Sequence, residues 1–262
     1  MKQGAFDVLG NIAIVKFSRD TKVRIKKQFA DKLLSQNKSV KTVLEKTGKF
    51  KGRLRKQVTR HIAGEKTKEA LYKENGCVFR FNVDKTYFSP RLSNERKELS
   101  KLVKKGEEVL VMFAGVGPYP IVIAKNSQAR KVYSNEINRE ANKYAKLNIE
   151  LNKLKNKVEL LQGDIKRIAK KIKKGRARKF DMIIMPRPRL NDSFLREAFM
   201  LSKKGTRIYY YDFCKDDEVN LITNKIKSEA KKNRKRIKIL KIKKAGEIAP
   251  YKIRVRVDFR VL

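Results

Sequence analysis

The spacing of apolar residues changes along the chain, and the change falls near residue 97. Before this point, residues 11–17 alternate like a β-strand, residues 22–37 carry apolar side chains at helical spacing, and residues 76–83 alternate again. These short elements predict a small α/β domain over residues 1–82.

From residue 97 onward, apolar strands alternate with helical segments. Strands are expected at residues 107–113, 131–137, 157–163, 180–185 and 206–213. The clearest helix is residues 138–154, where Ala141, Ala145 and Ile149 lie on one face. Repeated strand–helix units favour a mostly parallel sheet with helices on both faces. Residues 236–262 predict an antiparallel hairpin that finishes the sheet, with Gly246 and Pro250 in its turn.

Charge is the strongest feature of the composition. The chain has 68 Lys and Arg against 27 Asp and Glu, a net charge of +41. This charge favours a polyanionic partner, nucleic acid above all. The alternative is a lysine-rich thermophilic proteome, but such proteomes enrich glutamate as well. Residues 166–179 and 225–244 are almost purely basic, and we favour phosphate contacts over merely solvated helix faces.

The rarer residues exclude several classes of protein. Cys77 and Cys214 have no CxxC spacing, which fits a reduced intracellular setting without a disulfide framework. The single histidine, His61, rules out a metal motif built on two histidines, and no metal site is expected. Membrane spans need ~20 apolar residues, and neither such a run nor a signal peptide is present. We therefore expect a soluble cytoplasmic protein without membrane contact.

The candidate chemistry begins at residues 109–125, VLVMFAGVGPYPIVIAK, where a strand runs into Gly115 and Gly117. A Gly-x-Gly after a strand of a parallel sheet is typical of a backbone turn against a nucleotide, although such turns also serve packing. Glu136 follows the second strand, roughly twenty residues later, where a carboxylate can accept both ribose hydroxyl protons. Asp164 follows the third strand and is placed to meet an adenine amino group. Each acid alone is also typical of an exposed loop or a helix cap.

The pyrophosphate fingerprint is incomplete. After Gly117 the chain continues with Pro118 and Pro120, so the third glycine is missing. Proline has no N–H with which to bind a phosphate. The pocket therefore suits an adenosine with a non-phosphate tail, such as S-adenosylmethionine, better than a dinucleotide.

Together these motifs resemble the archaeal and eukaryotic tRNA (guanine-37-N1)-methyltransferases and their wyosine-pathway relatives. The resemblance rests on MFAGVGPYPIVIAK, NEIN, QGDI and, most specifically, KTYFSPRLSNERKEL, and it covers essentially the whole chain. It implies a Rossmann-like class I methyltransferase domain with a mostly parallel seven-stranded sheet over residues 83–262. The small domain would help to hold the anticodon arm of tRNA. The implied reaction transfers a methyl group from S-adenosylmethionine to N1 of guanosine 37. Some archaeal members of the family also methylate a tricyclic wyosine intermediate, and this second substrate stays open here. We expect a monomer.

Methylation at N1 of guanine needs a base for a weakly acidic proton and a cation near O6. From spacing alone, Arg91 and Glu95 fit a surface ion pair one helical turn apart. The resemblance implies instead that Glu95 is the general base, that Arg91 stabilises charge on O6, and that Arg55 is a second catalytic arginine. The cofactor contacts implied by the resemblance are Tyr87, Phe113, Gly115, Gly117, Glu136, Ile137, Asp164 and Pro188.

Three departures from the family pattern leave alternatives open. Val111 stands where an acidic residue is common, and Pro186 replaces the asparagine of Asn-Leu-Pro, although Pro188 keeps its second proline. The chain also begins at the family's second domain, so we expect the domain that checks the outer corner of tRNA to be absent and tRNA selection to be relaxed. One alternative is an aminocarboxypropyl transferase, which Arg91 disfavours because that branch typically replaces this arginine. The other is a catalytically silent tRNA-binding protein.

Overall fold

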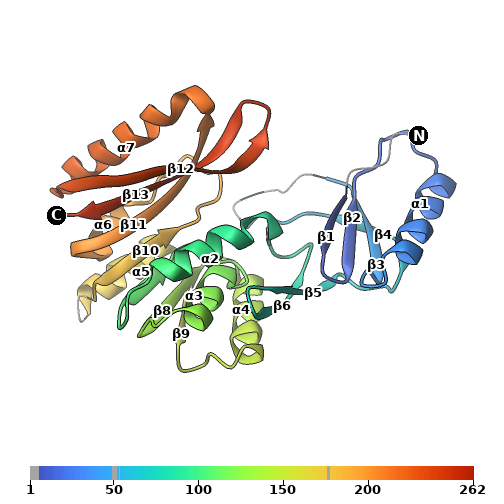
Figure 1. Ribbon diagram of the computed structural model, residues 1–262, viewed down its shortest axis with the longest axis horizontal. Coiled ribbons are helices and arrows are strands. Elements are labelled where there is room, and N and C mark those ends of the chain that lie inside the picture. Colours follow the sequence, from blue (N-terminus) through green and yellow to red (C-terminus); the bar gives the residue numbers. More distant parts are fainter. Residues whose placement is uncertain (1–5, 49–51, 53, 176–177) are drawn as a thin grey trace.

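The computed structural model describes residues 6–48, 52, 54–175 and 178–262. Figure 1 shows an elongated molecule, with a small sheet at the N-terminal end and a large sheet covered by helices at the other. None of the helices in these ranges is long and apolar enough to cross a membrane.

The small sheet has four strands in the order β1-β2-β3-β4. Their bounds are β1 (Phe6–Leu9), β2 (Ile12–Val15), β3 (Thr42–Lys46) and β4 (Thr59–Gly64), with helix α1 (Val23–Gln36) between β2 and β3. The helix buries Ala30 and Leu33 against Val15 and Val43 of the sheet. The strand and helix predicted at residues 11–17 and 22–37 are confirmed.

The alternating segment at residues 76–83 forms the second strand of a separate hairpin, β5 (Glu69–Glu74) and β6 (Cys77–Asn82). Two asparagine side chains of helix α4 (Arg139–Leu151) and its C-cap complete the hydrogen bonds of β6. Asn148 Oδ1 accepts from the Arg80 N–H at 2.7 Å, and Asn152 Oδ1 accepts from the Val78 N–H at 2.9 Å. The hairpin thus lies against the large domain, and the division at residue 82 stays a prediction.

The large sheet has seven strands in the order β12-β13-β11-β10-β7-β8-β9. Their bounds are β7 (Glu108–Val111), β8 (Lys131–Glu136), β9 (Val158–Gln162), β10 (Phe180–Met185), β11 (Ser202–Lys215), β12 (Ile237–Ala249) and β13 (Lys252–Val261). The five neighbouring strands β11, β10, β7, β8 and β9 are parallel to one another. Strand β13 lies between β11 and β12 and is antiparallel to both. The predicted sheet and its final hairpin are confirmed. The turn itself is at Pro250 and Tyr251, whereas Gly246 lies in an irregular part of β12.

Helices cover both faces of this sheet (Figure 1). One face carries α2 (Ser93–Leu102), preceded by the turn η1 (Pro90–Leu92), together with α3 (Pro118–Asn126) and α4. The other carries α5 (Ile165–Lys174), α6 (Leu195–Leu201) and α7 (Val219–Lys232), which follows the turn η2 (Asp216–Glu218). The basic stretch at residues 225–244 divides between α7, whose Ile226 is fully buried, and the edge strand β12.

Candidate active site

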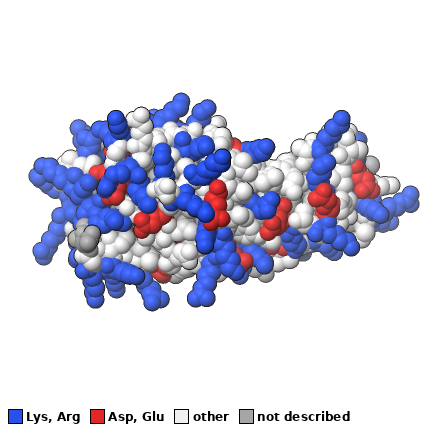
Figure 2. Space-filling view, turned by 90° about the horizontal axis from the view of Figure 1, so that it is seen from below, with Lys and Arg blue, Asp and Glu red and all other residues white. Residues whose placement is uncertain are grey.

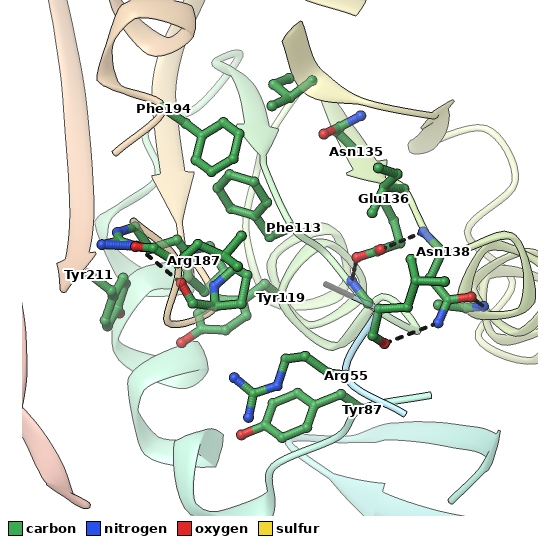
Figure 3. Close-up of a pocket in the computed structure, with 18 of the residues that line it drawn as sticks. Arg55, Tyr87, Phe113, Tyr119, Asn135, Glu136, Asn138, Arg187, Phe194 and Tyr211 are labelled. Atoms are coloured by element: carbon green, nitrogen blue, oxygen red, sulfur yellow. Dashed lines mark hydrogen bonds between the residues drawn. The ribbon is translucent and has the colours of Figure 1, made fainter. Parts of the chain in front are cut away.

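A pocket opens where the parallel strands of the large sheet end and the chain from the small sheet passes over them (Figure 3). Leu54, Arg55 and Tyr87 come from the segments that join the two ends of the molecule. The strand ends contribute Phe113, Gly115, Asn135, Glu136, Ile137 and Gly163, and the loop after β10 contributes Pro186, Arg187 and Pro188. Tyr211, Phe213 and Arg254 close the side next to β13.

Glu136 joins the ends of β7 and β8. Its Oε2 accepts from the Gly115 N–H at 2.8 Å, and its Oε1 accepts from the Asn138 N–H at 2.7 Å (Figure 3). Gly115 has a φ of +59°, in the left-handed region that residues with a side chain rarely adopt, so the turn requires glycine. A carboxylate has about four acceptor positions, so Glu136 can accept from ribose hydroxyls in addition to these two backbone groups.

Asn138 ties the same edge to the segments from the small sheet. Its side chain accepts from backbone N–H groups in the first turn of α4, and its Nδ2 donates to the Lys85 carbonyl oxygen at 3.0 Å. This contact holds the chain near Tyr87 against the end of β8. Sequence reasoning missed Asn138, although the last letter of the NEIN motif marks it.

Arg55 and Tyr87 form one wall of the pocket. The Arg55 guanidinium lies over the Tyr87 ring, 3.8 Å from its centroid (Figure 3). Burial lowers the pKa of the Arg55 guanidinium, and the nearby charge of Arg254 lowers it further. Arginine nevertheless stays protonated in proteins, so the pocket holds a fixed positive charge stacked on an aromatic face.

Of the cofactor residues predicted from sequence, Tyr87, Phe113, Gly115, Glu136, Ile137 and Pro188 line this pocket, together with the predicted catalytic Arg55. Gly117 and Asp164 lie beside it. Gly117 precedes α3 with a φ of +90°, and an added Cβ would lie 3.0 Å from Ile121 Cδ1. Asp164 caps α5, where its Oδ1 accepts from the Lys166 N–H at 2.9 Å. The cofactor roles of all these residues stay predictions.

The loop after β10 is fixed by Arg187, which sequence reasoning also missed. Arg187 is 5% exposed, and its Nη2 donates to Asp212 Oδ1 at 2.7 Å. Its Nε donates to the Tyr210 hydroxyl at 3.1 Å, and its Nη1 donates to the Leu190 carbonyl oxygen at 2.9 Å. A buried arginine with these partners holds Pro186 and Pro188 in the pocket wall. The signal in the sequence is the charged residue between two prolines.

Arg91 and Glu95, the predicted catalytic pair, have different partners. Arg91 has a side chain that is 73% exposed, and its Nη2 lies 2.8 Å from Asp7 Oδ1 on β1. Glu95 is 6% exposed in the first turn of α2, and its Oε2 accepts from the Tyr211 hydroxyl at 2.8 Å. Glu95 therefore lies behind Tyr211, which lines the pocket.

Two buried tyrosines line the wall nearest Glu95. Burial raises the pKa of Tyr119 and, more strongly, that of Tyr211, so both hydroxyls stay protonated at neutral pH. The buried Tyr119 hydroxyl makes no hydrogen bond to any described residue. A buried hydroxyl without a partner costs free energy, and a polar ligand in the pocket would supply the missing bond.

A second groove adjoins the pocket between the small sheet and the segment before η1. Its walls include Lys16, Lys46, Arg91 and the aromatic rings of Phe6 and Tyr87. Tyr87 lines both cavities, so they meet at this residue. Figure 2 shows Lys and Arg side chains over both ends of the molecule, with smaller groups of acidic residues among them. Among the described residues, no His, Cys, Asp and Glu cluster has the composition of a metal site.

The mostly parallel sheet, the glycine turn after β7 and the carboxylate at the end of β8 define a Rossmann-like domain. Sequence comparison gives the particular family. The family model described as the TRM5/TYW2 methyltransferase domain matches residues 70–240, and that of the TYW2 N-terminal domain matches residues 2–67. The chain therefore belongs to the TRM5/TYW2 methyltransferase family, as its motifs predicted.

Two named relatives cover nearly the whole chain. The tRNA (guanine(37)-N(1))-methyltransferase Trm5b of Pyrococcus abyssi is 36% identical over 98% of this chain and 74% of its own length. The tRNA (guanine(37)-N(1))/4-demethylwyosine(37)-methyltransferase Taw22 of Nanoarchaeum equitans is 33% identical over 98% of this chain and 100% of its own length.

Solved structures share the fold. The crystal structure of Pyrococcus abyssi Trm5b has a TM-score of 0.85 and 35% identity, covering 99% of this chain and 75% of that one. A complex of aTrm5 with tRNALeu has a TM-score of 0.82 and 29% identity, covering 98% and 72%. Methanocaldococcus jannaschii Trm5 in complex with adenosine has a TM-score of 0.78 and 28% identity, covering 98% of this chain and 72% of that one. The predicted fold class is confirmed.

Proposed function

We propose that this protein transfers a methyl group from S-adenosylmethionine to N1 of guanosine 37 in tRNA. The observation that supports the proposal is that the pocket and the second groove, whose walls carry Lys16, Lys46 and Arg91, meet at Tyr87. A nucleoside in the pocket and an RNA backbone along the groove would then lie next to each other. The names of the relatives supply the reaction, and the adenosine complex supplies the cofactor class. The net charge of +41 suits binding of the anticodon arm by a monomer.

The pocket residues fit an adenosine with an amino-acid tail. Glu136 would accept the ribose hydroxyls, while Phe113, Ile137 and Pro188 would pack on the adenine and on the tail. The unpartnered Tyr119 hydroxyl adds a buried donor. When bound, S-adenosylmethionine supplies an electrophilic methyl group on a sulfonium.

Residues of the chain must accept the N1 proton of the guanine and stabilise the negative charge that develops as it leaves. Glu95 would accept the N1 proton, and Arg55 would face the oxygen on which negative charge develops. For Arg91 to assist, it must first leave Asp7. Exposed ion pairs of this kind are worth about 0–1 kcal/mol, so an RNA phosphate or the guanine itself can displace Asp7.

A tricyclic guanosine derivative is proposed as a further substrate, because the Nanoarchaeum equitans relative carries a double name and is matched over 100% of its length. The pocket wall supports this. Pro186 stands where the resemblance expects an asparagine, so no amide at this position selects between the edges of guanine and of a larger base.

The direct test incubates the protein with labelled S-adenosylmethionine and tRNA transcripts that carry G or A at position 37, followed by nucleoside mass analysis. We expect 1-methylguanosine from the G37 transcript and no product from the A37 transcript. A tRNA that carries the tricyclic base tests the further substrate. A mass gain of an aminocarboxypropyl group there would identify the alternative transferase, and cofactor binding without product would refute methyl transfer.

A further inference from the structure

The hydroxyl group of Tyr119 is a buried polar group that the protein leaves without a partner. Tyr119 lines the pocket and is 3% exposed, and its hydroxyl makes no hydrogen bond to any residue that the structure describes. Nearly all buried polar groups in proteins are hydrogen-bonded, so an exception in a pocket wall points to a bond that a ligand completes.

The packing of the ring keeps this hydroxyl in the pocket wall. Tyr119 lies in the first turn of α3. Its ring meets that of Tyr211 edge-on, with 6.3 Å between the ring centroids. The Arg96 guanidinium lies 5.6 Å from the Tyr119 centroid, and Arg96 is in turn held by Glu74 through two hydrogen bonds. The ring is therefore held by its neighbours, and the direction of its hydroxyl is fixed before a ligand enters.

The hydroxyl faces the end of the pocket that is rich in hydrogen-bond donors and positive charge. In Figure 3 it points away from Glu136 and toward the side that holds Arg55 and Tyr211. Glu136 is the only carboxylate among the described residues that line the pocket, whereas Arg55 and Arg254 are cations. Burial raises the pKa of Tyr119, so its hydroxyl keeps its proton and can donate. The ligand atom that fits here is an acceptor oxygen that carries negative charge.

Two ligand groups have such an oxygen: the carboxylate of the cofactor tail and the O6 carbonyl of guanine. The wall favours guanine, because Tyr211 contacts Tyr119 on one side and donates to Glu95 at 2.8 Å on the other. A cofactor carboxylate at this place would lie near a second carboxylate, and like charges disfavour each other. Guanine has a donor, N1–H, and an acceptor, O6, side by side on one edge, and this pair matches a carboxylate beside a hydroxyl.

We propose that the Tyr119 hydroxyl donates a hydrogen bond to O6 of the target guanine and is a specificity-determining residue of the reaction. This inference rests on the proposed function, which places the guanine at this end of the pocket. Adenine has an amino donor in place of O6, so it cannot accept this bond. Negative charge moves onto O6 as the N1 proton leaves, so the bond strengthens during the reaction, and Tyr119 is then also a catalytic residue.

Tyr119→Phe removes the hydroxyl oxygen and leaves the ring. Because this oxygen has no partner in the free protein, the urea midpoint should stay at the wild-type value or rise. The single-turnover rate on the G37 transcript should fall by about 100- to 1,000-fold, as for other lost donors to a developing negative charge. Cofactor affinity, measured by calorimetry, should not change.

Tyr133→Phe is the matched control. Tyr133 is also 3% exposed, but its hydroxyl donates to Glu108 Oε1 at 3.0 Å, and it does not line the pocket. The same atom is removed, yet the expected results are reversed: the urea midpoint should fall and the methylation rate should stay at the wild-type value. General destabilisation cannot produce this pair of results.

The choice of O6 is tested with tRNA that carries 6-thioguanosine at position 37. Sulfur accepts hydrogen bonds weakly, so the rate loss caused by Tyr119→Phe should shrink to roughly tenfold or less on this substrate. In filter binding with S-adenosylhomocysteine present, Tyr119→Phe should weaken binding of G37 tRNA by roughly two- to tenfold and leave binding of the 6-thioguanosine tRNA almost unchanged.

Four results would overturn the proposal. A loss of stability equal to that of Tyr133→Phe would show that the Tyr119 hydroxyl bonds a group of the protein, such as Tyr211. Weaker cofactor binding would assign the hydroxyl to the cofactor tail. A wild-type rate, or an equal rate loss on G37 and 6-thioguanosine tRNA, would exclude O6. If wild-type protein methylates neither tRNA, the proposed function fails, while the filter-binding comparison still decides whether Tyr119 contacts O6.

Discussion

The pocket and a cluster of charged side chains lie on two sides of Tyr211 and are built in different ways. The members of the cluster are Glu95, Glu98, Lys243, Arg256 and Asp258. The pocket is shaped by backbone: a glycine turn and two N–H groups fix its carboxylate, Glu136. The cluster is shaped by side-chain charge, with Arg256 bonded to all three acids. The pocket is therefore fixed mainly by the backbone, whereas the cluster depends on the charges of its side chains.

Increasing the salt concentration should weaken tRNA binding much more than cofactor binding. If the basic surface contacts six to ten phosphates, tRNA affinity falls by roughly three to five decades between 50 and 200 mM salt. Cofactor affinity should change little, because the pocket does not rely on phosphate contacts. Filter binding and calorimetry across the salt range measure the two. A flat salt dependence for tRNA would mean that the basic stretches are only solvated faces.

Arg55→Met tests the charge in the pocket wall. The variant keeps an unbranched side chain over Tyr87 but loses the cation, and lost charge-stabilising donors typically cost about 100- to 1,000-fold in rate. Single-turnover methylation should slow by this factor, with cofactor affinity little changed. Arg60→Met is the control, because Arg60 is an exposed partner of Glu45 on the small sheet. Equal rates for both variants would remove Arg55 from the chemistry.

Glu136→Gln tests whether the carboxylate of Glu136 binds the cofactor. The amide keeps the shape but loses the charge that would receive the ribose hydroxyls, and hydrogen bonds to charged groups contribute about 1.5–3 kcal/mol each. Cofactor affinity should fall by roughly 10- to 150-fold at 1.4 kcal/mol per decade, while the single-turnover rate at saturating cofactor falls much less. Calorimetry with unchanged affinity would exclude Glu136 from the cofactor site.

The smallest expected effect is on stability in acid. Because the pKa of Glu98 is lowered to about 2 from 4.5, its ionised form stabilises the fold above pH 4.5, and this contribution is lost as pH falls toward 2. The wild-type urea midpoint should therefore fall more between pH 5 and pH 3 than that of Glu98→Gln. Parallel pH dependences would show that Glu98 gains nothing from Lys243 and Arg256.

The pocket could be predicted from sequence because its residues directly follow the strands that hold them. A glycine turn after one strand and an acid after the next fall at the same edge of a parallel sheet, whichever helices surround them. Gly117 and Asp164 each lie at the start of a helix beside the pocket, and their cofactor roles stay predictions. Asp164 caps α5, as a helix-cap acid would, and a cap leaves its other carboxylate oxygen lone pairs able to accept from a ligand.

The cluster had no local signal. Arg256 and Glu95 are 161 positions apart, and they meet only because β13 inserts between β11 and β12. The expected pairing of Arg91 with Glu95 followed helical spacing, but Arg91 precedes α2 in the turn η1 and bonds Asp7 instead. Arg187 was not predicted for the same reason, because its partner Asp212 lies on β11, far from it in sequence.

The central claim, that a buried carboxylate behind the pocket takes the proton, is tested most directly by the single-turnover rate of Glu95→Gln on the G37 transcript. The amide keeps the shape and one acceptor oxygen, so tRNA and cofactor affinity should stay near wild type. The rate should fall by roughly two to four decades, the usual contribution of a positioned general base. Raising the pH should recover part of this loss, because more guanine is then deprotonated without help. A Glu95→Gln protein with the wild-type single-turnover rate would contradict the account.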